Sequence, residues 1–152
     1  MGSTGRIVAF EPNPEILKLL RENIVANKAG NVLVEPIACT DREQTLTLWA
    51  SASFNTGMSS LARENADISY EEPPRPYTVR GRSIDDVARE LNLTKVNAIK
   101  VDVEGAEVGV LRGAMKTLKL SPETCGGSGF ATARQLQNDA GRPCCGHHWS
   151  RI

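Results

Sequence analysis

The chain has 152 residues, and its 18 lysine and arginine residues balance its 18 aspartate and glutamate residues. This length suits a single domain, and the zero net charge gives no electrostatic attraction to nucleic acid or to an anionic membrane. No apolar run approaches the roughly 18 residues that cross a membrane, and residues 1–5 do not resemble a signal peptide, so we expect a cytoplasmic protein without nucleic-acid or membrane partners.

The C-terminal part of the chain differs in composition from the rest. Residues 121–152 are rich in glycine and polar residues and have no clear period. We therefore divide the chain into a domain over 1–120 and a tail over 121–152 that is irregular, disordered or read from a non-native frame. The adjacent cysteines (144 and 145) and adjacent histidines (147 and 148) of the tail cannot easily share one tetrahedral ion, so no metal site is predicted.

The first forty residues alternate strand, helix and strand. Arg6–Phe10 is an apolar strand candidate. Asn13 is a good N-cap and Pro14 suits the first helical position, so a helix is predicted from there to about Asn27–Gly30. A second strand is predicted over residues 31–38, which completes a parallel crossover unit.

The middle of the chain predicts strands separated by polar loops. Residues 45–49 alternate polar and apolar side chains, as in a half-buried strand compatible with antiparallel pairing. Residues 53–61 are small and polar and form a loop that can approach a ligand. The prolines within 69–78 predict an extended surface loop, followed by a short strand over 77–80. Ser83 to Asp86 resembles a capping box that opens a helix through Leu91.

An acidic turn follows the next predicted strand. Ile99–Val103 is rich in β-branched residues and predicts a buried strand that carries Asp102 and, just past its end, Glu104. These two acids point to the same side if the strand persists, and Glu107 falls in the first turn of a following helix. That helix carries apolar residues at helical spacing (Val108, Leu111, Met115 and Leu118). Each acid taken alone could be a cap, a first-turn helix acid or a solvated side chain, but three acids in six residues after an apolar strand favour a site.

Glu11 ends the first predicted strand. In nucleotide-binding α/β folds a carboxylate at this place accepts hydrogen bonds from both hydroxyls of a ribose. The alternative interpretation is a turn acid before Pro12.

Taken together, these segments resemble the FkbM family of S-adenosylmethionine-dependent methyltransferases. The matching segments lie in the family's order over roughly residues 5–120 (8–14, 23–27, 55–61, 83–85, 99–107 and 110–114). The resemblance implies a Rossmann-like class I methyltransferase sheet in an α/β fold. It also implies S-adenosylmethionine as methyl donor and O-methylation of a hydroxyl on a small molecule or glycan.

The resemblance also implies roles for particular residues. Those implied to bind the cofactor include the ribose ligand and a residue near the adenine (Glu11, Asn13, Asp41 and Asp102). Those implied to face the methyl-transfer centre are the two acids of the turn (Asp102 and Glu104), which are the candidate base or substrate-orienting pair. Those implied to contact the substrate line the cleft beside them (Asn55, Ser59 and Glu107).

The chain departs from the family pattern at both ends. Members of the family begin with a strand and a glycine-rich loop that wraps the methionine half of the cofactor, and residues 1–5 lead straight into the second strand. The missing strand normally lies between the strand that ends at Glu11 and the strand that ends at Asp102. Further strands that follow residue 120 in the family are also missing, so we expect an interior fragment with an incomplete sheet.

Two other functions remain open. The first is a non-catalytic remnant that self-associates as a homo-oligomer through the sheet edges left exposed. The second is a nicotinamide-dependent oxidoreductase, because an acid at Glu11 would serve that cofactor's ribose equally well. The acidic turn and the lack of a tyrosine–lysine pair at helical spacing argue against the second.

Overall fold

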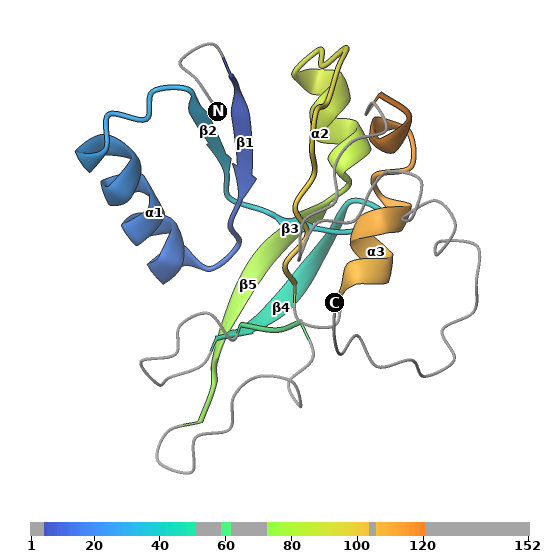
Figure 1. Cartoon of the computed structure of the whole chain (residues 1–152). Helices are drawn as coiled ribbons and strands as arrows, with labels where there is room; N and C mark the ends of the chain where they lie inside the picture. Colours follow the sequence, from blue (N-terminus) through green and yellow to red (C-terminus); the bar gives the residue numbers. More distant parts are fainter. Residues whose placement is uncertain (1–4, 51–58, 62–72, 104–105, 121–152) are drawn as a thin grey trace, which may run out of the picture.

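The computed structural model describes residues 5–50, 59–61, 73–103 and 106–120. These ranges form a mixed α/β structure with two small sheets and three α-helices (Figure 1). None of the described helices is long and apolar enough to cross a membrane. The predictions made for Asn55, for Glu104 and for the tail over 121–152 lie outside the described residues.

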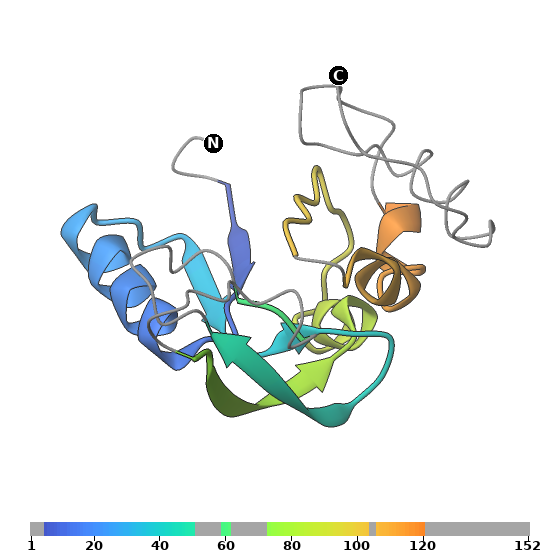
Figure 2. The same ribbon diagram turned by 90° about the horizontal axis from the view of Figure 1, so that it is seen from below.

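The predicted crossover unit at the start of the chain is confirmed. Strand β1 (Ile7–Phe10) pairs in parallel with strand β2 (Val32–Glu35), and helix α1 (Pro14–Ala26) connects them. The side chain of Asn13 accepts a hydrogen bond from the backbone N–H of Glu15 at 2.9 Å, as expected of an N-cap. Figures 1 and 2 show this unit beside the second sheet.

The second predicted strand is divided into two. Residues 31–38 supply β2 to the first sheet, whereas strand β3 (Ala38–Cys39) belongs to the second sheet. Pro36 lies between them, and proline has no N–H to donate to a ladder and a fixed φ. The prediction of one continuous strand was therefore wrong, and the break at Pro36 passes the chain from one sheet to the other.

The second sheet has the strand order β3-β5-β4. Strand β4 (Gln44–Ala50) pairs antiparallel with strand β5 (Arg75–Arg82) over seven residue pairs, while β3 pairs with β5 in parallel. The predicted half-buried strand over 45–49 is confirmed, and its pairing is antiparallel.

Strand β5 begins at Arg75, two residues before the predicted start at residue 77. It therefore includes Pro76, which the sequence placed in a proline-rich loop. Pro76 lies opposite Trp49 in the ladder. The N–H and C=O of Trp49 bond to Ser60 instead, at 2.8 and 2.9 Å, so this position of the ladder needs no N–H from β5. A proline is therefore tolerated inside the strand at this one register position.

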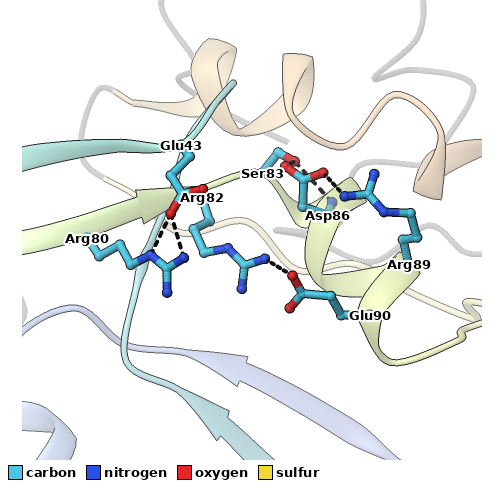
Figure 3. A network of polar contacts seen from close by, with 7 residues as sticks. All are labelled: Glu43, Arg80, Arg82, Ser83, Asp86, Arg89 and Glu90. Atoms are coloured by element: carbon cyan, nitrogen blue, oxygen red, sulfur yellow. Dashed lines mark hydrogen bonds and ion pairs between the residues drawn. The ribbon is translucent and has the colours of Figure 1, made fainter.

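Helix α2 (Ile84–Glu90) is fixed to the second sheet by polar contacts. The hydroxyl of Ser83 accepts the N–H of Asp86 at 3.0 Å and donates to the Asp86 carboxylate at 2.7 Å, which confirms the predicted helix start. Figure 3 shows the ion pairs that extend this network to β5 and to the residue before β4 (Arg80–Glu43, Arg82–Glu90 and Arg89–Asp86). Of these pairs, Arg82–Glu90 joins β5 to α2, Arg89–Asp86 lies within α2, and Arg80–Glu43 joins β5 to the residue before β4.

The last predicted helix is interrupted. Helix α3 (Glu107–Arg112) ends at Gly113, and a 3-10 turn (Thr117–Leu120) follows. A Cβ at Gly113 would lie 1.9 Å from the carbonyl oxygen of Thr40, so only glycine allows this approach to the end of β3. The Asp85 carboxylate then accepts the N–H groups of Lys116 and Thr117 at 2.7–3.0 Å, which fixes the start of the turn.

The main core lies between α2, α3 and the 3-10 turn (Ile84, Val110, Leu111, Ala114 and Leu118). Val108, which the helical pattern placed inside, is 38% exposed. Leu111 and Leu118, which the same pattern placed inside, are buried, at 8% and 2% exposed, on either side of the interruption at Gly113.

Residues 97–103 are extended but do not form the predicted buried strand. Ile99, Val101 and Val103 pack partly buried against the main core, while Lys100 and Asp102 are exposed and form an ion pair at 2.7 Å. This alternation is that of a strand. No neighbouring strand pairs with the segment among the described residues, so it lacks the ladder that defines one.

The contact between Gly113 and Thr40 predicts a large effect of one added methyl group. Gly113→Ala should lower the free energy of unfolding by about 1–3 kcal/mol or more, because the new Cβ meets backbone that cannot move aside. Gly109→Ala is the matched control in α3, where a Cβ meets nothing within 4 Å. It should be neutral or stabilise the helix by about 0.5–1 kcal/mol. Urea denaturation of both variants measures the difference, and equal effects would contradict the contact.

Candidate functional site

A cleft of about 910 Å³ lies between β1 and the extended segment 95–103. Its further lining comes from β3, α2 and residues 59–61. Glu11, at the end of β1, and Asp102, on the opposite wall, both line it. The structure therefore brings together the two acids that the sequence placed at the ends of separate strands.

Glu11 is held in one orientation at the end of β1. Its Oε1 accepts the backbone N–H of Asn13 at 2.7 Å, and its own N–H donates to the carbonyl of Glu35 at 3.1 Å. Burial raises the pKa of the Glu11 carboxyl, and the hydrogen bond from Asn13 opposes this in part. One carboxylate oxygen is thus fixed by the protein, while the other accepts no hydrogen bond from the described residues.

Asn13 positions its neighbours and does not line the cleft. Its side chain is 3% exposed, with Oδ1 on the N–H of Glu15 and Nδ2 donating to the hydroxyl of Ser59 at 3.0 Å. The sequence assigned Asn13 to the cofactor. The structure shows it joining the start of α1 to Glu11 and to Ser59.

Ser59 lies at the cleft, as the predicted substrate-contacting residue would. Two backbone hydrogen bonds between Ser60 and Trp49 attach residues 59–61 to the outer edge of β4. With the Asn13 bond to its hydroxyl, Ser59 is held from two sides. The site therefore combines groups from β1, from the edge of β4 and from segment 95–103.

Two other predicted residues lie outside this lining. Asp41 is at the surface, where its carboxylate pairs with Arg42 at 2.9 Å. Glu107 is exposed in the first turn of α3. The structure thus groups Glu11, Ser59 and Asp102 and does not group Asp41 or Glu107 with them.

Sequence reasoning missed two features of the cleft. Lys100 bonds the Asp102 carboxylate, and the period of two along an extended segment could have placed them on one face. Cys39 packs against the main core and also lines the cleft. Burial raises the pKa of its thiol to about 12, so it is protonated at neutral pH.

No group of three or more histidine, cysteine, aspartate or glutamate side chains that could hold a metal ion occurs in the described part of the chain. The cleft is mostly apolar, with fewer polar groups in its lining. An acid at the carboxyl end of a parallel strand, next to a crossover helix and facing a cleft, is the arrangement by which α/β proteins bind ligands.

A family model described as the methyltransferase FkbM domain matches residues 1–125, so the chain belongs to this family. The chain is 28% identical over 154 residues to Methyltransferase 1 of Beauveria bassiana (strain ARSEF 2860), covering 89% of this chain and 61% of that protein. It is 30% identical over 132 residues to Methyltransferase sdnD of Sordaria araneosa, covering 71% of this chain and 51% of that protein. The chain thus spans between half and two thirds of these curated relatives. No solved structure matches it.

The two bonds of the Asn13 side chain predict different effects of two substitutions. Asn13→Ala should lower the free energy of unfolding by about 1–2 kcal/mol, because α1 loses its cap. Asn13→Ser keeps an oxygen for the N–H of Glu15 but is too short to reach Ser59, so it should lose less than half as much. Urea denaturation compares the two, and equal losses would show that the cap contributes little.

The raised pKa of Glu11 predicts a stability difference with a defined dependence on pH. A carboxyl group whose pKa is higher in the folded chain favours folding at low pH and loses this contribution as the pH rises through the folded value. Glu11→Gln keeps an oxygen for the Asn13 N–H, so at pH 7 it should be more stable than the wild type. The difference should vanish as the pH falls below the usual value of 4.5. The stability difference is measured from denaturation midpoints of both proteins at about half-unit pH steps from pH 3.5 to 8. A Glu11→Gln variant less stable than the wild type at pH 7 would contradict the prediction.

Proposed function

We propose that this cleft belongs to a methyltransferase site that binds S-adenosylmethionine and transfers its methyl group to a hydroxyl oxygen. Membership of the FkbM family supports the reaction class. The single observation that carries the proposal for this chain is that Glu11 and Asp102 line one cleft from opposite walls.

Glu11 is the residue proposed to hold the cofactor's ribose. A carboxylate has two acceptor oxygens that match two neighbouring hydroxyls. The N–H of Asn13 fixes the carboxyl group of Glu11 in place, and no group of the described residues bonds its second oxygen. Partial burial strengthens hydrogen bonds made there, because water competes less for the same groups. These features fit a nucleoside at the end of β1.

Asp102 is the residue proposed to act on the acceptor. S-adenosylmethionine, when bound, supplies a methyl group on a sulfonium centre. The acceptor hydroxyl must be aligned with that group and must give up its proton, and a carboxylate within reach can do both. The Asp102 carboxylate forms an exposed ion pair with Lys100 at 2.7 Å. Glu104 lies outside the described residues, and its role in the same step stays a prediction.

The lining of the cleft supports one class of acceptor over another. Apolar side chains form most of the two walls (among them Ile7, Val8, Phe10, Ile99 and Val101). Polar lining groups are fewer, and they include Glu11, Ser59 and Asp102. We therefore place a hydroxyl carried on a mainly apolar skeleton ahead of a glycan, whose many hydroxyls would lie against groups that cannot bond them.

Calorimetric titration with S-adenosylmethionine tests the proposal. Binding is expected for the full chain, and Glu11→Ala should weaken it by about tenfold or more, because a hydrogen bond to a charged group contributes about 1.5–3 kcal/mol. Glu22→Ala is the control, since Glu22 is an exposed acid of α1 outside the cleft.

Each other outcome selects a different function. No heat with S-adenosylmethionine would support a non-catalytic chain. Binding of NAD in its place would support the oxidoreductase alternative. If Glu11→Ala and Glu22→Ala weaken the binding of S-adenosylmethionine equally, Glu11 is not part of the binding site.

A further inference from the structure

The side chain of Asn13 has one orientation that satisfies its hydrogen bonds. The backbone N–H of Glu15 can only donate, so the atom of Asn13 that it bonds at 2.9 Å is the carbonyl oxygen Oδ1. The amide nitrogen Nδ2 therefore points to the other partner, the hydroxyl of Ser59, at 3.0 Å. Exchanging the two ends of the amide would place a donor against the N–H of Glu15. Because Asn13 is 3% exposed, water cannot readily relieve that conflict.

This orientation determines what the Ser59 hydroxyl can offer to a ligand. A hydroxyl has one proton and two lone pairs, whereas an amide nitrogen donates and does not accept. Ser59 must therefore accept the bond from Asn13, and its own proton is directed elsewhere. No described residue accepts that proton, and Ser59 lines the cleft. Ser59 thus presents a hydrogen-bond donor to the cleft.

Glu11 has the opposite character and is attached to the same residue. The backbone N–H of Asn13 bonds one oxygen of the Glu11 carboxylate at 2.7 Å, and no described residue bonds the second oxygen. An ionised carboxylate accepts hydrogen bonds and cannot donate them. Glu11 and Ser59 each lie one hydrogen bond away from Asn13, and both line the cleft. The cleft therefore carries an acceptor and a donor that one buried residue holds close together.

We propose that Glu11 and Ser59 together bind one hydroxyl of the cofactor's ribose, which donates its proton to Glu11 and accepts the proton of Ser59. A hydroxyl is the ligand group that donates and accepts through a single atom. The inference rests on the proposed binding of S-adenosylmethionine. It assigns Ser59 to the cofactor, whereas the family resemblance implied a contact with the substrate. Asn13 is a positioning residue, because it sets the direction of the Ser59 bond without lining the cleft.

Other groups of the cofactor match this pair less well. Its carboxylate could accept from Ser59 but would be repelled by the carboxylate of Glu11. Its ammonium group would suit Glu11 but has no lone pair for the Ser59 proton. The edge of the adenine ring offers a donor and an acceptor on two separate atoms, and analogues that lack a ribose hydroxyl distinguish this case.

Asn13→Asp reverses the direction of one hydrogen bond and keeps the start of α1. Aspartate caps helices about as well as asparagine does, so the bond from the Glu15 N–H is retained. The second oxygen of the new carboxylate faces Ser59 and can only accept, so Ser59 turns its proton toward residue 13. Ser59 then offers only lone pairs to the cleft. The ribose hydroxyl also offers only lone pairs there, because its proton is on Glu11.

Calorimetric titration of the full chain with S-adenosylhomocysteine, which has the same ribose, measures the consequence. The titrations are made at about pH 8, where the carboxyl groups are ionised. In the native background Ser59→Ala should weaken binding about three- to tenfold, as expected for the loss of one neutral hydrogen bond. In the Asn13→Asp background the same substitution should leave binding unchanged or strengthen it. Each comparison is made at constant charge, so the effect of the added carboxylate cancels.

The 2′-deoxy and 3′-deoxy forms of S-adenosylhomocysteine identify the hydroxyl. With one of the two forms Ser59→Ala should have no effect, because the partner of Ser59 is already missing. With the other form the weakening should persist. Weakening that persists with both forms would place Ser59 against another part of the cofactor, such as the adenine edge, and would overturn the inference.

Circular dichroism of the three variants establishes that they are folded. Equal weakening by Ser59→Ala in the native and Asn13→Asp backgrounds would show that Asn13 does not set the direction of the bond, and would overturn the inference. Binding of S-adenosylhomocysteine that Ser59→Ala does not change would overturn the inference alone and leave the proposed function standing. No binding by the unchanged chain would overturn both.

Discussion

The arrangement of this structure depends on one close approach of backbone to backbone, between Gly113 and Thr40. The carbonyl of Gly113 accepts the N–H of Asp85 at 2.8 Å, and the Asp85 carboxylate bonds the turn after α3. The end of β3, the start of α2 and the end of α3 therefore meet at one point. Segment 97–103 packs on the core formed there, so this contact also sets where one wall of the cleft lies.

The other wall is set by a separate group of contacts around Asn13. Its backbone N–H holds Glu11, and its side chain caps α1 and bonds Ser59. Glu11 and Ser59 are thus positioned by local geometry at the junction of β1 and α1, whereas Asp102 comes from a distant part of the chain. Partial burial of the charged Glu11 carboxylate destabilises the folded chain at neutral pH. Such perturbed acids are common at functional sites.

Features that depend on neighbours in sequence could be predicted, and features that depend on distant contacts could not. The caps at Asn13 and Ser83 were predicted because side chain and backbone lie within three residues of one another. The strand at Ile99–Val103 failed because its period is that of a strand but pairing needs a partner, which the period does not supply. The location of Glu11 and Asp102 in one cleft was expected from the family resemblance. The ion pair between Lys100 and Asp102 was not predicted.

Pro36 has a mechanical consequence. It divides the chain into a β1–α1–β2 unit and a unit built on the second sheet, joined through Pro36 and Ile37 and tied at the surface by the Tyr77 hydroxyl on Glu15 at 2.6 Å. Each unit contributes one wall of the cleft. A molecule that bonds both walls therefore links the two units. Its binding free energy stabilises the arrangement in which the two units lie at this separation.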